Sequence, residues 1–103
     1  MPYGLTEETI AQVCRILARF PEVEEAVVYG SRAKGNFKPG SDVDLTLTGD
    51  TLNLQLLNRI SIDIDDLLLP YTFDLSIYHH IKNPDLIAHI DRVGRVFYRA
   101  DWS

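Results

Sequence analysis

The chain has 103 residues, of which 46% are hydrophobic and 24% charged, and its formal net charge is −5. This length suits one hydrophobic core, so we expect residues 1–103 to form a single domain. The acidic excess argues against a stand-alone nucleic-acid binder, because such proteins bind mainly by neutralising phosphates. No apolar run reaches the roughly 18 residues of a membrane span, and no basic leader precedes one. The sequence therefore predicts a cytoplasmic protein without membrane insertion.

The first half of the chain predicts a helix, a strand, a basic loop and a second strand. Residues 6–20 begin with a threonine cap and two glutamates and then carry apolar residues at helical spacing. Residues 26–29 form a short β-type run. Residues 30–40, GSRAKGNFKPG, are rich in glycine and basic residues, which favours a loop with room for one helical turn. Residues 43–48 alternate with period two, as a half-buried strand does.

The second half predicts a helix, a strand, a helix and a last strand. Residues 51–69 have leucine and isoleucine at helical spacing; a part of this stretch also alternates like a strand, but its length and leucines favour helix. Residues 72–78 predict a strand. Residues 83–94 start with Asn-Pro and end at glycine, which is typical of a helix, and residues 96–98 predict a final strand. This order predicts a small mixed β-sheet with helices packed on it, of class α+β or α/β.

Three carboxylates stand where they could share a metal ion. Asp42 and Asp44 are two residues apart at the head of a predicted strand, so we expect them on one face, with Val43 facing the core. Asp74 is on the polar side of another predicted strand. If the two strands pair, the three acids converge and repel one another, and a hard cation such as Mg²⁺ or Mn²⁺ removes that cost. The alternative is that Asp42 caps a turn while Asp44 and Asp74 lie on a solvated sheet face.

The basic loop offers groups for an anion. Gly30 follows a strand directly and lacks a Cβ, so its backbone can approach a ligand closely. Ser31 supplies a hydroxyl and lies where successive N–H groups can form an anion-binding turn. Arg32, Lys34 and Lys38 place three cations in an otherwise acidic chain, although a solvated basic loop is the alternative. The segment lacks the Lys-Ser/Thr of a P-loop.

The spacing of these two features carries a resemblance to a known family. Gly30, Ser31, Asp42 and Asp44 meet the pattern Gly-Ser, ten residues, Asp-x-Asp, in the text GSRAKGNFKPGSDVDL. Asp74, in TFDLSIY, fits a third carboxylate. The chain thus resembles the DNA polymerase β-type nucleotidyltransferase superfamily, most closely its minimal nucleotidyltransferase (MNT) members. The resemblance covers nearly the whole chain.

The resemblance implies a role for each of these side chains. Asp42 and Asp44 would each hold metal, and Asp74 would bind the catalytic metal and help to deprotonate the acceptor, with two Mg²⁺ ions expected and Mn²⁺ as a substitute. Gly30 and Ser31 would hold the β- and γ-phosphates. Arg32 and Lys34 would either steady the leaving pyrophosphate or only screen its charge.

The resemblance also implies a reaction and a partner. The domain would transfer a nucleoside monophosphate, AMP from ATP before other nucleoside triphosphates, to a hydroxyl acceptor. Minimal members often pair with a small helical-bundle protein, in some cases a HEPN-type toxin, and resemble antitoxins that transfer AMP to a tyrosine of it. A hetero-oligomer is therefore expected, because 103 residues leave little protein to grip an acceptor. The alternative is a catalytically idle module that binds nucleotide and docks a partner; the intact carboxylates count against it.

Several conspicuous residues receive plainer interpretations. His79 and His80 are expected to diverge on an extended segment as a surface pair. His89 lies in the last predicted helix at no metal-ligand spacing. Candidate contacts for a partner are apolar: residues 67–69 (three leucines), Phe37 and Trp102.

Overall fold

Four strands form one mixed sheet in this computed structural model, which describes residues 1–102. The strands are β1 (Glu25–Tyr29), β2 (Val43–Thr48), β3 (Phe73–Ile77) and β4 (Arg95–Arg99). The helices are α1 (Glu7–Leu17), α2 (Ser31–Lys34), α3 (Leu54–Asp65) and α4 (Pro84–Val93), with 3₁₀ turns η1 (Pro2–Gly4) and η2 (Tyr78–His80). The predicted fold class, α+β with helices on a mixed sheet, is confirmed.

The strand order is β3-β2-β1-β4. β1 is antiparallel to both β2 and β4, whereas β2 and β3 are parallel. A parallel pair needs a long crossover, and α3 supplies it between β2 and β3. The parallel pair matters for the site, because it brings the beginnings of β2 and β3 to the same edge of the sheet.

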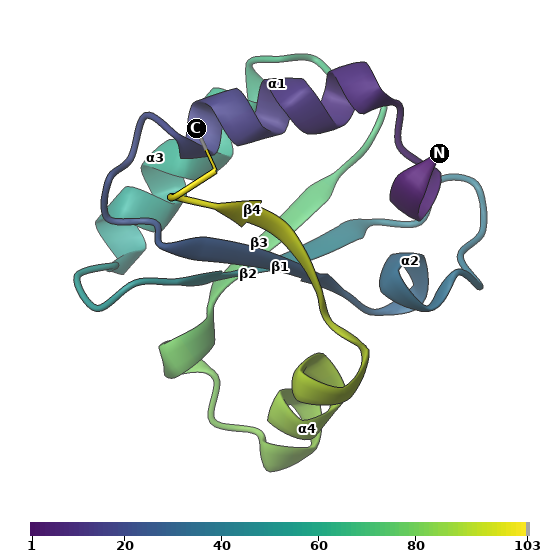
Figure 1. Cartoon of the computed structure of the whole chain (residues 1–103). Coiled ribbons are helices and arrows are strands. Elements are labelled where there is room, and N and C mark those ends of the chain that lie inside the picture. The colour runs from purple at the N-terminus through teal and green to yellow at the C-terminus, as the bar shows by residue number, and fades with distance from the viewer. Residues whose placement is uncertain (103) are drawn as a thin grey trace.

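The helices cover the two faces of the sheet unequally. Figure 1 shows α1 and α3 across one face, and α4 on the other. The core lies under α1 and α3, and the alternate residues of β2, Val43, Leu45 and Leu47, point into it with no exposed surface. The residues between them, beginning with Asp44, therefore belong to the opposite face, on which α4 packs against β1.

Side-chain caps explain where the helices begin. The Thr6 side chain accepts a hydrogen bond from the Thr9 N–H at 3.1 Å, and Asn53 accepts one from the Leu56 N–H at 2.9 Å. Asn83 caps α4 in the same way, ahead of Pro84. The helix predicted over residues 51–69 is confirmed, although α3 is shorter at both ends. No helix within residues 1–102 is both long and apolar enough to cross a membrane.

Candidate active site

A row of three residues crosses the sheet face opposite the core at its α2 end. Asp44 of β2 is the register partner of Tyr29 in β1 on one side and of Asp74 in β3 on the other. Neighbouring strands are about 4.7–4.9 Å apart, so the two carboxylates stand side by side. The expected pairing of these strands is confirmed, and it places Asp44 and Asp74 at one point.

Gly30 brings the basic loop to the same point. Its backbone has φ 75° and ψ −154°, a conformation for which glycine is suited. A Cβ on Gly30 would lie 2.5 Å from Asp44 Oδ2, which is closer than real Cβ contacts come. The turn and the carboxylate therefore meet directly, and any side chain at position 30 would fill the space between them.

The electrostatics of Asp44 fit a cation-binding site. Partial burial raises the pKa of Asp44 above its ordinary value of 3.8, and the charges of Asp74 and then Asp42 raise it further. His89 of α4 acts in the opposite direction. Two adjacent carboxylates that repel each other are a suitable donor set for Mg²⁺, which takes one or two carboxylates and completes its shell with water and substrate phosphates.

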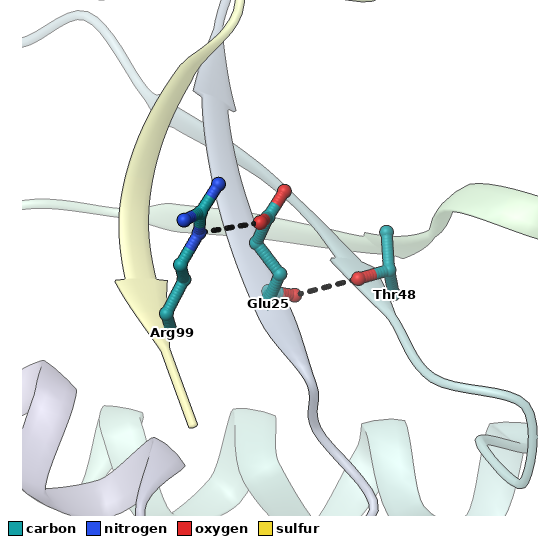
Figure 2. Close-up of polar contacts among 3 residues, drawn as sticks. All are labelled: Glu25, Thr48 and Arg99. Carbon is teal, nitrogen blue, oxygen red and sulfur yellow. Dashed lines mark hydrogen bonds and ion pairs between the residues drawn. The ribbon is translucent and has the colours of Figure 1, made fainter. Parts of the chain in front are cut away.

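The other end of this face offers a contrast. Glu25, at the start of β1, accepts a hydrogen bond from Arg99 Nε at 3.0 Å in an ion pair, and its backbone carbonyl accepts one from Thr48 Oγ1 at 3.5 Å (Figure 2). A cleft of about 330 Å³ opens there, between Glu25, Tyr78 and Asp91, away from the row of acids. Glu25 thus has its cation within the chain, whereas Asp44 lies among acids.

Asp42 differs from the expectation in one respect. The strand begins at Val43, so Asp42 precedes β2 and is exposed. It is near enough to raise the pKa of Asp44. Within residues 1–102, however, no three Asp, Glu, His or Cys side chains gather closely enough to form a metal cluster. The structure brings Asp44 and Asp74 together, and the predicted three-carboxylate group is not assembled by the protein alone.

The loop after Gly30 forms the short helix α2. Its first backbone bonds run from Lys34 N to Gly30 O at 3.1 Å and from Gly35 N to Ser31 O at 3.0 Å. The N–H groups that precede Lys34 have no earlier turn to bind, and such groups attract anions. Ser31 is half-buried at this end of the helix, and Lys34 is exposed at the other.

Arg32 does not share this exposed position. Only 3% of its surface is accessible, and its guanidinium donates to the backbone carbonyls of Ser41 and Tyr3. The sequence predicts Arg32 and Lys34 alike as cations near the phosphates. In the structure Lys34 is on the side of α2 that faces solvent, whereas Arg32 is buried on the side that faces the N-terminal segment.

Sequence reasoning does not single out two residues that lie near the acids. Tyr29 ends a predicted strand, and His89 lies in the last predicted helix at no metal-ligand spacing. Their rings pack edge to face, with 6.2 Å between the ring centroids. His89 acts to lower the pKa of Asp44, whereas the acids act on the pKa of Tyr29. Burial raises the pKa of Tyr29, and the charges of Asp44 and Asp74 add to that rise. A signal was present: Tyr29 is in phase with the polar face.

Two buried hydroxyl groups lie one row behind the acids. Thr46 and Ser76 are register partners in β2 and β3, and neither hydroxyl oxygen has a hydrogen-bond partner within residues 1–102. Ser76 is near enough to the Tyr29 phenol to lower its pKa somewhat, but short of good hydrogen-bonding geometry. The face behind the carboxylates is therefore polar and incompletely satisfied.

The expectation for His79 and His80 was wrong in its geometry. They lie in η2, a 3₁₀ turn, and not on an extended segment. Their rings are 4.7 Å apart in an edge-to-face arrangement instead of diverging. Both are exposed, as expected for a surface pair.

A glycine turn against paired carboxylates, on a mixed sheet of this order, defines a nucleotidyltransferase-type domain. The family model described as polymerase beta, nucleotidyltransferase, matches residues 11–103. The chain belongs to this family. A search of curated proteins found no match.

Solved structures with similar folds include toxin–antitoxin complexes. One, a toxin–antitoxin with AMP-PNP, has a TM-score of 0.69 and 19% identity, covering 94% of this chain and 76% of that chain. Another, a tri-AMPylated Shewanella oneidensis HEPN toxin with its MNT antitoxin, has a TM-score of 0.66 and 14% identity, covering 92% and 73%. A third, the MntA–HepT complex, has a TM-score of 0.65 and 14% identity, covering 91% and 73%. At these identities the likeness shows a shared fold.

Proposed function

We propose that this protein is a Mg²⁺-dependent nucleotidyltransferase that transfers AMP from ATP to a hydroxyl group of a partner protein. The observation that carries the proposal is the contact between the Gly30 backbone and the Asp44 carboxylate, with Asp74 beside it. An anion-binding turn and a pair of metal-binding acids are needed at one place for phosphoryl chemistry, because the phosphates and the metal must meet. Family membership supports the reaction class.

Each residue then has a task. The N–H groups at Gly30 and Ser31 bind the β- and γ-phosphates, and the exposed amine of Lys34 screens their charge. Asp44 and Asp74 would hold the metal, with Asp42 as a third ligand. When bound, Mg²⁺ would neutralise charge on the triphosphate and favour the deprotonated form of the acceptor hydroxyl.

The transfer exchanges one bond at the α-phosphorus for another. The acceptor oxygen forms a bond to the α-phosphorus of ATP, and the bond from that phosphorus to the oxygen bridging to the β-phosphate breaks. Pyrophosphate leaves. The acceptor proton passes to a carboxylate, for which exposed Asp74 is placed on the open side of the row. Asp74 therefore acts as the base as well as a metal ligand.

The acceptor is proposed to be a HEPN-type partner, with this protein as the antitoxin. Three similar structures are toxin–antitoxin complexes, one with AMP-PNP and one with an AMPylated HEPN toxin. These support ATP as the donor and a protein as the acceptor. The acids also lie on an open face, where a macromolecule can approach them.

The test is transfer of label to the partner. The protein is co-purified with the product of the neighbouring gene and incubated with Mg²⁺ and ATP labelled on the α-phosphate or, separately, on the γ-phosphate. We expect α-label and a mass increase of AMP groups on the partner, with γ-label released as pyrophosphate. Asp44→Asn should abolish the transfer. Nucleotide binding with no transfer of either label would favour the idle docking module.

A further inference from the structure

Arg32 carries a buried positive charge with no carboxylate beside it among residues 1–102. The residue is 3% exposed, and the one ion pair found within this range is that of Glu25 with Arg99. Burying a charge is costly unless polar groups compensate it. The charge of Arg32 is therefore compensated by polar groups other than carboxylates.

The compensation comes from backbone carbonyls and aromatic rings. Arg32 Nε and Nη2 both donate to the Ser41 carbonyl, at 3.0 and 2.7 Å, and Nη1 donates to the Tyr3 carbonyl at 2.8 Å. The guanidinium carbon lies 4.9 Å from the ring centre of Phe37 and 5.3 Å from that of Tyr71. Arg32 therefore contacts three segments at once: η1, the end of the basic loop at Ser41, and the segment before β3.

The hydrogen bonds from Arg32 to the Ser41 carbonyl lie directly beside Asp42 in the chain. The Ser41 carbonyl belongs to the peptide group that joins Ser41 to Asp42, so fixing that oxygen fixes the plane from which Asp42 projects. On the other side of Asp42, the Val43 N–H donates to the Thr72 carbonyl at 2.8 Å, and Thr72 follows Tyr71 in the chain. Exposed Asp42 is thus held between two anchored peptide groups, although it lies outside the strand.

We propose that Arg32 is a positioning residue that aims Asp42 at the metal held by Asp44 and Asp74, and that it does not bind the nucleotide. The inference rests on the proposed function in taking Asp42 as a metal ligand. A phosphate reaching the guanidinium would have to displace the Ser41 and Tyr3 carbonyls and enter a space that Phe37 and Tyr71 enclose. Lysine cannot replace this arginine, because one ammonium cannot span carbonyls on two segments with a planar fork.

The test measures Mn²⁺ alone, by the electron paramagnetic resonance signal of the free ion, without catalysis. We expect Arg32→Lys to weaken Mn²⁺ binding at least about tenfold, as changes behind metal ligands do. Binding of a fluorescent ATP analogue in EDTA should change less than about twofold, since removing an outlying support leaves a direct phosphate site intact. Lys38→Ala, which removes an exposed cation from the same loop, is the matched control for the metal and should leave Mn²⁺ binding unchanged.

A double-mutant cycle identifies the route. If Arg32 acts through Asp42, then Arg32→Lys should cause no further loss of Mn²⁺ affinity in the Asp42→Asn protein. Losses that multiply would overturn the proposal, and so would a loss of nucleotide affinity in EDTA. If Asp42→Asn itself leaves Mn²⁺ binding unchanged, Asp42 is not a metal ligand, and the inference fails whether or not Asp44 and Asp74 bind metal. If Asp42→Asn weakens binding but folded Arg32→Lys does not, only the role of Arg32 is wrong.

A milder pair of variants covers the case in which Arg32→Lys does not fold. Tyr71→Leu removes one aromatic face from the guanidinium and leaves the arginine in place, whereas Tyr71→Phe keeps that face. We expect Tyr71→Leu to weaken Mn²⁺ binding and Tyr71→Phe to bind Mn²⁺ as the parent does. Equal Mn²⁺ affinity in two folded Tyr71 variants would overturn the proposal.

Discussion

The backbone of Gly30 lies against the carboxylate of Asp44, so closely that a Cβ on Gly30 would be 2.5 Å from Asp44 Oδ2. The contact joins the end of β1 to the beginning of β2, the two elements that carry the anion-binding turn and a metal-binding acid. Its importance can be separated from the general cost of replacing a glycine. Gly35 in the same loop also has a positive φ, 84°, but apart from its chain neighbours no atom of the described residues 1–102 lies within 4 Å of its Cβ position.

Gly30→Ala should therefore be far more damaging than Gly35→Ala. The Gly35 change costs only left-handed backbone strain, about 1–2 kcal/mol. The Gly30 change adds a clash with Asp44 and should cost at least about 3 kcal/mol in the free energy of unfolding or abolish transfer, depending on which group moves. Thermal unfolding and labelled-ATP transfer measure both. Similar stability and activity in the two variants would show that the contact does not matter.

Asp44→Asn should remove metal binding while leaving the fold intact. The asparagine has the same shape but no charge, so the divalent ion loses a ligand and the apo protein loses a repulsive charge. We expect Mn²⁺ titration in the presence of a non-hydrolysable triphosphate to show binding largely lost, with no decrease in the unfolding temperature of the apo protein. Asp65→Asn, at an exposed position of α3, is the control. Unchanged Mn²⁺ binding in Asp44→Asn would rule out this site.

The raised pKa of Asp44 makes a prediction about pH. A carboxyl group whose pKa is higher in the folded state than its ordinary 3.8 favours folding while it is protonated. That contribution is complete below pH 3.8 and is lost as the pH rises through the raised value. In EDTA, the stability of the parent relative to Asp44→Asn should therefore fall as pH rises through this window. Urea unfolding of both proteins at several pH values measures it, and an opposite slope would contradict the assigned environment.

The pattern of the sequence was sufficient to predict the two central acids. Alternation with period two placed Asp44 and Asp74 opposite the core residues of their strands, and both predictions of phase are confirmed by burial of Val43 and Ile77. The same rule put Asp42 at the head of this strand, whereas Asp42 lies one residue before β2 and is exposed. Period-two reasoning applies within a strand and not to the residue that precedes it.

The environment of Arg32 was beyond sequence reasoning for a physical reason. Arginine is rarely buried, and a cation in a Gly-rich loop is normally solvated. Its acceptors are backbone carbonyls of Ser41 and Tyr3, nine and 29 residues away, and backbone carbonyls leave no mark in a sequence. The register that aligns Asp44 with Asp74 was similarly open until the parallel pairing of β2 and β3 was known.

Substitutions at Ser31 and Lys38 should differ sharply in their effect on ATP affinity. Ser31→Asp places a negative charge at the start of α2, where a bound triphosphate would repel it by about 4 kcal/mol at a separation of 4 Å. Lys38→Ala removes an exposed side chain and should cost less than about 1 kcal/mol. The structure offers a check on folding, because the contact of Lys38 with Ser41 uses its backbone N–H and survives truncation. Equal losses of ATP affinity would mean a diffuse basic surface.

The apolar residues predicted to contact a partner are placed unequally. Leu68 is 88% exposed and has a positive φ of 55°, which leucine adopts only at a cost, and Trp102 is 56% exposed. Phe37 is half-buried instead and lies over Arg32. The segment that contains Leu68 leads into β3 and so to Asp74, which makes Leu68 the better candidate for a contact close to the site.

Leu68→Asn should consequently weaken binding to the partner without lowering the stability of the free chain. Asparagine tolerates a positive φ better than leucine does, so the free chain should be at least as stable, while a partner loses an exposed apolar contact. Co-expression with the product of the neighbouring gene and size-exclusion chromatography should show a hetero-oligomer for the parent, burying on the order of 1,200–2,000 Å². Leu54→Asn, an exposed leucine at the start of α3, is the control. A parent that elutes as a lone monomer and transfers AMP only to free small molecules would refute a protein acceptor, whereas equal binding by the two variants would move the interface away from Leu68.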